Sequence, residues 1–235
     1  MKSKKVLGVI PARGGSKGIP NKNIIKILDK PLINYTIEAA LNAELLTHCV
    51  VSTDDKLIAS IAEEAGARVP FMRPDNLSQD ISLSFPVIMH ALEFMEENEG
   101  VTYDAIMMLQ PTTPLRSSID IDESIKKLFS TKSDSVISVS DVGANHPLRM
   151  KRVIGDKLIN YIDQGCEDMR PRQQLPPVYI RNGAIYLAHR STLTQQQTFS
   201  GNDCRAYIMP EIRSINIDAN TDLIVAEHYI KKNKS

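Results

Sequence analysis

Short apolar runs alternate with longer segments of helical periodicity over the first 142 residues of the chain. Five runs rich in β-branched and other apolar residues each predict a buried strand. Between them, apolar residues recur three and four positions apart, which predicts amphipathic helices. The predicted strands cover residues 6–10, 49–52, 68–71, 105–109 and 135–142, and the predicted helices cover 31–43, 55–65, 84–97 and 119–130. This alternation predicts an α/β fold with a mostly parallel, doubly wound sheet.

The pattern changes after Gly143. Residues 144–177 hold two short β runs and several polar turns without helical periodicity, so we expect a small β-rich excursion within a single domain of residues 1–235. Strand patterns return at 178–188, 205–209 and 214–217, and a last helix is predicted at 221–232. The pattern therefore predicts one domain, in which residues 144–177 interrupt a single sheet.

Composition and charge narrow the classes of function. The 28 Lys and Arg residues balance 28 Asp and Glu, so no general surface for nucleic acid or membranes is expected. The cysteines at 49, 166 and 204 are scattered, which fits a reducing cytoplasm and offers no metal-binding spacing. No apolar stretch is long enough to cross a membrane, and the first apolar run is too short for a signal peptide. A cytoplasmic protein is therefore expected.

A glycine-rich stretch follows the first predicted strand. Gly14, Gly15 and Gly18 are interspersed with Arg13, Ser16 and Lys17. Glycines allow several backbone N–H groups to turn toward one point, and such a concave run binds anions. Arg and Lys add full positive charge. The pattern predicts a polyanionic ligand, most simply a nucleoside triphosphate.

Two better-known phosphate loops do not match this stretch. A P-loop needs Gly-Lys followed by Ser or Thr, whereas the order at 16–18 is Ser-Lys-Gly. The dinucleotide fingerprint needs the spacing G-x-G-x-x-G, which is absent here. A solvated hairpin turn is the alternative interpretation, and for Lys22 a solvated side chain stays open. The position directly after a strand favours the ligand site, because α/β ligand sites lie at strand carboxyl ends.

Polar residues recur after the other predicted strands. Arg73, Asp80 and Ser82 follow the third strand, where the alternative is a surface Arg–Asp pair of little energetic value. Two prolines stiffen the loop at 110–116 after the central strand, which suits a preorganised site. Asn216 and Asp218 lie two residues apart in a predicted strand, so they are expected on the same side. A carboxylate pair there would hold Mg²⁺ against phosphate oxygens.

Three segments of the sequence resemble a known family. They are residues 13–18 with 21–23, the Leu-Gln-Pro-Thr-Thr-Pro-Leu-Arg run at 109–116, and Asn-Gly-Ala-Ile-Tyr at 182–186. In matching order they resemble the CMP-sialic acid synthetases, cytidylyltransferases that activate nonulosonic acids. The resemblance extends from Ile10 to Asp218 and implies a Rossmann-like nucleotidyltransferase sheet.

The resemblance also implies roles for individual residues. Arg13 and Lys17 are implied to hold the triphosphate and, with Asp218, to be catalytic. Many members have Asp at both metal positions, whereas Asn216 accompanies Asp218 here. Arg116 is either structural or ligand-facing, and His146 fits a turn residue better than a catalyst. The implied nucleotide site is Arg13, Ser16, Lys17, Asn23, Arg73, Asp80 and Ser82, the implied sugar site is Gln110, Arg149, Arg172, Tyr186 and Phe199, and the implied metal site is Asp218 with Asn216.

The implied reaction transfers CMP from CTP to the anomeric hydroxyl of a sialic-acid-like sugar, with Mg²⁺ as cofactor and pyrophosphate as product. N-acetylneuraminate is the favoured acceptor, and legionaminate or a related acid is the alternative; Kdo ranks low. A metal-bound hydroxide, a water and Asp218 are candidates for the general base. Residues 144–177 are implied to mediate a homodimer, with Phe199 reaching the neighbouring subunit's pocket. A non-catalytic nucleotide-binding module is the more distant alternative.

Overall fold

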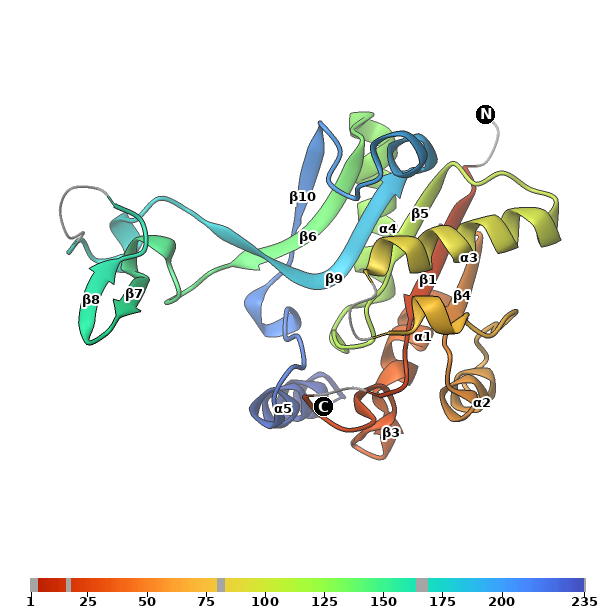
Figure 1. Ribbon diagram of the computed structural model, residues 1–235, viewed down its shortest axis with the longest axis horizontal. Helices are drawn as coiled ribbons and strands as arrows, with labels where there is room; N and C mark the ends of the chain where they lie inside the picture. The colour runs from red at the N-terminus through yellow and green to blue at the C-terminus, as the bar shows by residue number, and fades with distance from the viewer. Residues whose placement is uncertain (1–3, 16–17, 80–82, 164–168, 235) are drawn as a thin grey trace.

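The computed structural model describes residues 4–15, 18–79, 83–163 and 169–234. Its main feature is a six-stranded sheet with the strand order β10-β6-β9-β5-β1-β4 (Figure 1). Five of the strands are parallel, and β9 runs antiparallel to both of its neighbours. The strands are β1 (Val6–Pro11), β4 (His48–Ser52), β5 (Ala105–Met108), β6 (Ser135–Asp141), β9 (Tyr179–His189) and β10 (Cys204–Ile208). The expected mostly parallel α/β sheet is confirmed, and β5 is central.

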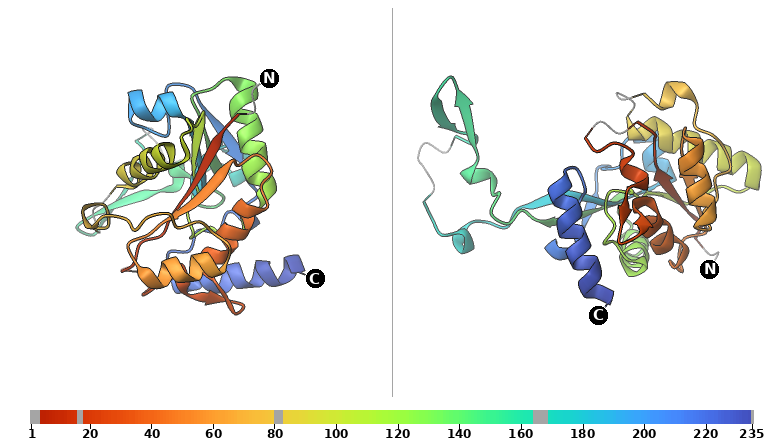
Figure 2. Two further views of the ribbon diagram at one scale, coloured as in Figure 1. Left: turned by 90° about the vertical axis from the view of Figure 1, so that its right-hand side faces the viewer. Right: turned by 90° about the horizontal axis from the view of Figure 1, so that it is seen from below.

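Helices cover both faces of the sheet (Figure 2). Side chains alternate along β1, so that Val6 and Ile10 enter one apolar cluster while Leu7 and Val9 enter the other. The first cluster packs against three helices and the second against α3. The helices are α1 (Leu32–Leu41), α2 (Lys56–Glu64), α3 (Ser84–Glu99), α4 (Ser118–Thr131) and α5 (Asn220–Lys234). Helices on both faces make the sheet doubly wound, as expected.

Two expected strands do not form. In place of a strand at 68–71, the chain makes two isolated bridges, Val50 with Arg68 and Thr53 with Met72. Pro70 lies between them and has no N–H to donate to a ladder. Residues 214–217 follow the turn η6 (Glu211–Arg213) without strand pairing. The backbone N–H of Ile217 donates instead to the carbonyl of Thr112, at 2.8 Å. The first segment still lies beside β4, the edge strand of the sheet. The second still lies at the carboxyl end of β5, beside Thr112.

Residues 144–163 and 169–177 project from the sheet as an arm, which stands away from the body in Figure 1 and in the right-hand view of Figure 2. The arm carries an antiparallel hairpin of β7 (Lys151–Ile154) and β8 (Lys157–Asn160), and two short turns, η3 (Pro147–Arg149) and η4 (Arg172–Gln174). Its root is an extension of β6 and β9, which still pair from Val139 with Arg181 to Asp141 with Tyr179. The expected β-rich excursion therefore has a defined shape.

A third apolar cluster joins α5 to the chain near the glycine-rich loop. Ile19, Ile217 and Ile230 are buried together there with Leu32 and Leu115. This packing brings the last helix and the segment before it against the pocket side of the sheet. The small elements in this part of the chain are η1 (Lys22–Ile24), β2 (Lys26–Ile27) and β3 (Lys30–Pro31), and the others are η2 (Asp75–Leu77) and the π-helical turn η5 (Thr192–Gln196). Among the described residues, no helix has both the length and the apolar character that a membrane crossing requires.

Candidate active site

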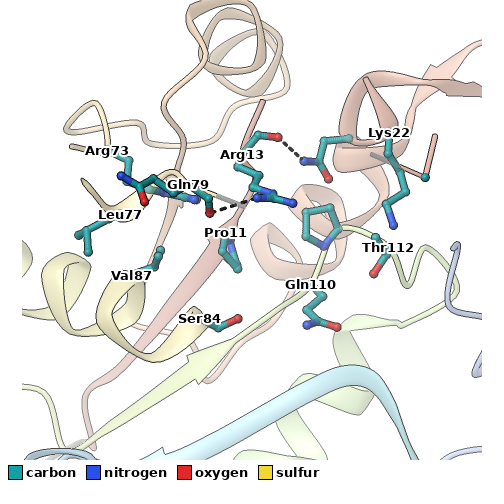
Figure 3. Close-up of a pocket in the computed structure, with 13 residues that line it drawn as sticks. Pro11, Arg13, Lys22, Arg73, Leu77, Gln79, Ser84, Val87, Gln110 and Thr112 are labelled. Carbon is teal, nitrogen blue, oxygen red and sulfur yellow. Dashed lines mark hydrogen bonds between the residues drawn. The ribbon is translucent and has the colours of Figure 1, made fainter. Parts of the chain in front are cut away.

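A pocket of about 400 Å³ lies at the carboxyl ends of β1 and β5 (Figure 3). It is the place where parallel α/β sheets bind ligands. The loop after β1, the turn η1, the segment between α2 and α3, the start of α3 and the loop after β5 all contribute to its wall. The lining residues are Pro11, Arg13, Gly18, Lys22, Asn23, Arg73, Leu77, Gln79, Ser84, Val87, Gln110, Pro111 and Thr112. Segments far apart in sequence thus meet in one concave site.

The glycine-rich loop is tied down at both sides of Arg13. Asn23 Nδ2 donates to the backbone oxygen of Arg13 at 2.9 Å, and Arg13 Nη1 donates to the backbone oxygen of Gln79 at 3.2 Å (Figure 3). The N–H of Gly14 donates to Asp54 Oδ1 at 3.0 Å. Asn23 is buried, and its hydrogen bond to Arg13 holds the start of the loop in place. The implied ligand residues Ser16 and Lys17 lie outside the described residues.

Arg73 is a buried cation at the wall of the pocket. Only 6% of the residue is exposed, and its Nε donates to Ser52 Oγ at 3.1 Å. A second bond joins Arg73 Nη2 to the Ser52 backbone oxygen. Burial lowers the pKa of Arg73 to about 10, and nearby Asp54 partly opposes that shift. Such a fixed guanidinium is a preorganised donor, and not half of a solvated surface pair. Asp80 and Ser82 lie outside the described residues.

The polar end of the pocket includes an ion pair that joins the two ends of the chain. Lys22 Nζ lies 3.0 Å from Asp218 Oδ1 and 3.0 Å from the Ile217 backbone oxygen. Asn216 Nδ2 donates to Asp218 Oδ2 at 2.7 Å. Asn216 and Asp218 therefore meet, although no strand holds them. A Cβ added to Gly18 would lie 3.3 Å from the Asp218 backbone oxygen, so the glycine-rich loop closely approaches this segment.

The donor set partly fits the implied Mg²⁺. Asp218 offers a largely exposed carboxylate beside the pocket, and Mg²⁺ commonly takes one or two carboxylates together with substrate phosphates. Asn216 uses its amide nitrogen to hold that carboxylate, while its own Oδ1 is buried without a hydrogen-bond partner. Within the described ranges, no three His, Cys, Asp or Glu residues cluster as a ready metal cage. Asp218 is thus the fitting ligand, and Asn216 orients it.

The loop after β5 is anchored by a buried arginine. Arg116 is 3% exposed and donates to Thr113 Oγ1 and to the Ala184 backbone oxygen, both at 2.8 Å, and to Thr36 Oγ1 at 2.6 Å. Burial lowers its pKa to about 10. Of its two possible roles, the structure supports the structural one. The loop in turn directs Gln110 into the pocket.

The remaining implied sugar residues do not line this pocket. Tyr186 lies on β9 edge-on to Phe199 of the same chain, with ring centroids 6.2 Å apart. Arg149 and Arg172 belong to the arm, where Arg149 donates to the Arg170 backbone oxygen and Arg172 lies 3.5 Å from Asp141. His146 caps the turn η3 by accepting from the Leu148 N–H, as a turn residue does.

Several lining residues were not identified from the sequence. Nothing in the sequence indicates the partner of Lys22, because Asp218 lies 196 positions away. Gln79 contributes a backbone oxygen, which carries no signal in the residue type. Four other residues line the wall although their residue types give no indication of it: Leu77, Ser84, Val87 and Thr112. Thr112 lies within the proline-bounded loop, which was the one available signal.

Comparison with known proteins places this chain in a family. The model of the family described as "Cytidylyltransferase" matches residues 7–200. The chain is 35% identical to an N-acylneuraminate cytidylyltransferase of Escherichia coli O18:K1:H7 over 94% of this chain and 51% of that protein. It is 30% identical to the CMP-N,N'-diacetyllegionaminic acid synthase of Legionella pneumophila over 98% of both chains. The chain thus spans about half the length of the first relative and nearly all of the second.

A solved structure supports the same fold. CMP:2-keto-3-deoxy-manno-octonic acid synthetase complexed with CTP superimposes with a TM-score of 0.70, at 19% identity, over 98% of this chain and all of that one. Its likeness in fold agrees with the mixed, mainly parallel sheet. The family match over most of the chain confirms the resemblance seen in the sequence motifs. The chain therefore belongs to the cytidylyltransferase family and is a nucleotidyltransferase.

Proposed function

We propose that this enzyme transfers CMP from CTP to the anomeric hydroxyl of a nonulosonic acid and releases pyrophosphate. The observation that carries the proposal is the convergence of Arg13, Lys22 and Arg73 on one pocket of a chain with zero net charge. Three cations at one strand-end pocket fit a polyanion such as a nucleoside triphosphate. The relatives named for CMP transfer to nonulosonic acids support the cytidine and the sugar acid.

The reaction needs charge stabilisation and positioning more than covalent chemistry by the protein. The anomeric hydroxyl oxygen attacks the α-phosphorus and gives up its proton to a base, for which Asp218 or a water is the candidate. A new P–O bond forms, and the bond to the leaving pyrophosphate breaks. We assign Arg13 and Lys22 to the phosphates, and Arg73 to the nucleoside end together with Asp80 and Ser82. Ser16 and Lys17 complete the phosphate contacts in this proposal, and Asn23 holds the loop in shape.

Asp218 is the residue of this chain that would hold Mg²⁺, with Asn216 orienting its carboxylate. A bound Mg²⁺ would supply positive charge to the phosphate oxygens. Lys22 now neutralises Asp218 at 3.0 Å. When the triphosphate enters, Lys22 can exchange that carboxylate for a phosphate oxygen, because an ammonium on a flexible stem reorients easily.

The acceptor site is proposed to be shared between two copies of the chain. Gln110 lines the pocket from within, whereas Arg149 and Arg172 lie on the projecting arm. An arm that carries exposed apolar residues fits a contact with a second copy. In such a dimer the arm arginines can bind the acceptor carboxylate in the partner's pocket, and Tyr186 with Phe199 forms the apolar side of the acceptor site.

Two acceptors are candidates. N-acetylneuraminate is favoured by the higher identity to the Escherichia coli relative, at 35%. A legionaminate-type acid is favoured by chain length, because the Legionella relative matches over 98% of both chains. The two acids share the carboxylate and the anomeric hydroxyl, so the phosphate end of the site serves both.

The test measures pyrophosphate release from CTP with Mg²⁺ and a panel of N-acetylneuraminate, N,N'-diacetyllegionaminate, pseudaminate and Kdo. We expect release with one of the first three acids. We also expect a strong preference for CTP over UTP, because the carbonyl that replaces the amino group of the base would leave the hydrogen-bonding groups of the site mispaired. CTP binding without release for any acid would instead identify a non-catalytic module. Equal rates with CTP and UTP would point to a different nucleotidyltransferase specificity.

A further inference from the structure

A β-bulge interrupts β9 where it passes behind the pocket. Ile137 of β6 pairs with Tyr186 and Val139 pairs with Arg181, so the register shifts here and residues 182–185 of β9 lie opposite Ser138 alone. Gly183 has a φ of +79°, a left-handed conformation that side chains with a Cβ rarely adopt. Bulges of this kind commonly redirect groups beside active sites.

Side chains satisfy the backbone groups that the bulge leaves unpaired. Asn182 Oδ1 accepts from Ser138 Oγ at 2.6 Å and from the Ala184 N–H at 3.2 Å. Ser138 Oγ accepts in turn from the Ile185 N–H at 2.7 Å. Asn182 also donates to Ser214 Oγ at 2.9 Å, in the segment that leads to Asp218. Because Asn182 and Ser138 are both buried, this arrangement is rigid.

The missing side chain of Gly183 leaves room for Gln110. A Cβ built on Gly183 would lie 2.6 Å from Gln110 Oε1 and 3.5 Å from Thr113 Cγ2. A carbon and an oxygen that are not bonded do not approach to 2.6 Å, so any other residue at 183 displaces the Gln110 carboxamide. The main chain of Gln110 cannot simply follow, because its carbonyl accepts from Thr113 Oγ1 and Arg116 Nη1.

Gly183 lies against one end of the Gln110 carboxamide. Its oxygen lies against Gly183, and in Figure 3 its amide nitrogen points toward Ser84, another residue of the pocket wall. The N–H groups are therefore the part of the side chain that is offered to a ligand. We propose that Gly183 is a positioning residue that sets the Gln110 carboxamide as a hydrogen-bond donor for the acceptor sugar. The identification of the ligand as the acceptor sugar rests on the proposed function, whereas the placement of Gln110 does not.

The test compares Gly183→Ala with Gly100→Ala. Gly100 has a similar φ of +62°, at the end of α3, but a Cβ there would have nothing within 4 Å. Both substitutions place a Cβ in the left-handed region and should lower Tm by a few degrees. Only Gly183→Ala should raise the KM for the acceptor, on the order of tenfold, while the KM for CTP stays within about twofold. An unchanged acceptor KM in Gly183→Ala would overturn the proposal.

A double variant separates the positioning role from simple strain. In the Gln110→Ala background the clash partner is gone, so adding Gly183→Ala should raise the acceptor KM no further and should recover part of the Tm lost in the single variant. If the two effects multiply, or if Gly183→Ala unfolds the protein with Gln110 present and absent alike, Gly183 serves the backbone alone and the proposal fails.

An NMR measurement on the enzyme without substrate tests the positioning of Gln110 independently of the proposed reaction. The side-chain amide resonances of Gln110 are assigned by their loss in Gln110→Ala. They should shift in Gly183→Ala and stay in place in Gly100→Ala, whichever acceptor is found. Unmoved resonances in Gly183→Ala would contradict the positioning role even in a fully active enzyme. A moved resonance in a protein that turns over no acid would contradict the proposed function alone.

Discussion

The body and the arm use similar apolar residues in opposite ways. Leu7 and Val9 on β1 are completely buried, whereas Val153 and Leu158 on the arm hairpin are 69% and 66% exposed. Both pairs are typical strand residues, and Val153 lies directly opposite Leu158 across β7 and β8. A two-stranded hairpin is only marginally stable by itself in water. The comparison teaches that a strand pattern predicts the strand but not what covers it.

The two regions also divide the proposed work. The body holds the pocket and its cations, and the arm offers an apolar surface together with Arg149 and Arg172. Substitutions in the body should therefore change chemistry without changing association. Substitutions of apolar arm residues should weaken association first, and should lower turnover only where the two copies separate, because the acceptor site is proposed to be shared between them. Four experiments test this division.

The largest effect is expected for Asp218→Ala. Loss of the carboxylate that fits the metal should lower kcat/KM about 1,000-fold, because metal-assisted charge stabilisation is worth several kcal/mol. The measurement is pyrophosphate release, with the oligomeric state checked by sedimentation. Asp203→Ala is the matched control, since it removes another exposed carboxylate in an ion pair, with Arg205 at 2.6 Å, away from the pocket. Normal turnover in Asp218→Ala would remove Asp218 from the site.

Arg13→Ala comes next, with an expected loss of about 100-fold, the usual effect of deleting one charged donor at a developing charge. Arg13 also holds Gln79 at 3.2 Å, so the KM for CTP should rise as well. Arg205→Ala, in the ion pair used above, should change kcat/KM little. Equal effects of the two arginine substitutions would mean that the pocket assignment is wrong.

Val153→Ser concerns the arm. The loss of one apolar side chain from each copy should weaken the proposed dimer about tenfold, since each buried methylene contributes about 0.8 kcal/mol. Sedimentation equilibrium gives the dissociation constant. Ile224→Ser on α5 is the matched control, because Ile224 is 70% exposed on the body. If Ile224→Ser weakens association as much as Val153→Ser, the arm has no special role in it.

The smallest effect is a pH dependence of the body's stability. Asp134 accepts from the N–H groups of Asn202 and Asp203 at 2.8 and 2.9 Å, and these bonds lower its pKa below 3.8. A lowered folded pKa gives a contribution that is present above pH 3.8 and is lost as the pH falls through the folded pKa. Asp134→Asn should therefore lower the free energy of unfolding at neutral pH and make little difference in strong acid. Urea titrations at both pH values check this, and an equal loss at both would contradict it.

The sequence predicts the body well, because its strands are buried on both faces and its helices are strongly periodic. It fails where one backbone atom decides the outcome. Pro70 removes a donor from the expected strand at 68–71, and Ile217 pairs with Thr112 instead of with a strand.

The site shows a similar division. Motif residues such as Arg13, Asn23, Arg73 and Gln110 do line one pocket. The pairing of Lys22 with Asp218 and the contact of Gln110 with Gly183 join segments that are distant in sequence. No periodicity or local spacing encodes such contacts, because they depend on how the loops are placed after the sheet has formed.

The position of β9 has a consequence for biosynthesis. It lies between β5 and β6 in the sheet, yet it follows both in the chain, after the whole arm. On the ribosome, β4, β1 and β5 can pair early, while β6 has to wait without its central neighbour until residues 179–189 emerge. Until then β5 and β6 present open edges of the kind that invite wrong pairing. A chaperone that binds the nascent chain would be needed most between the synthesis of β6 and the arrival of β9.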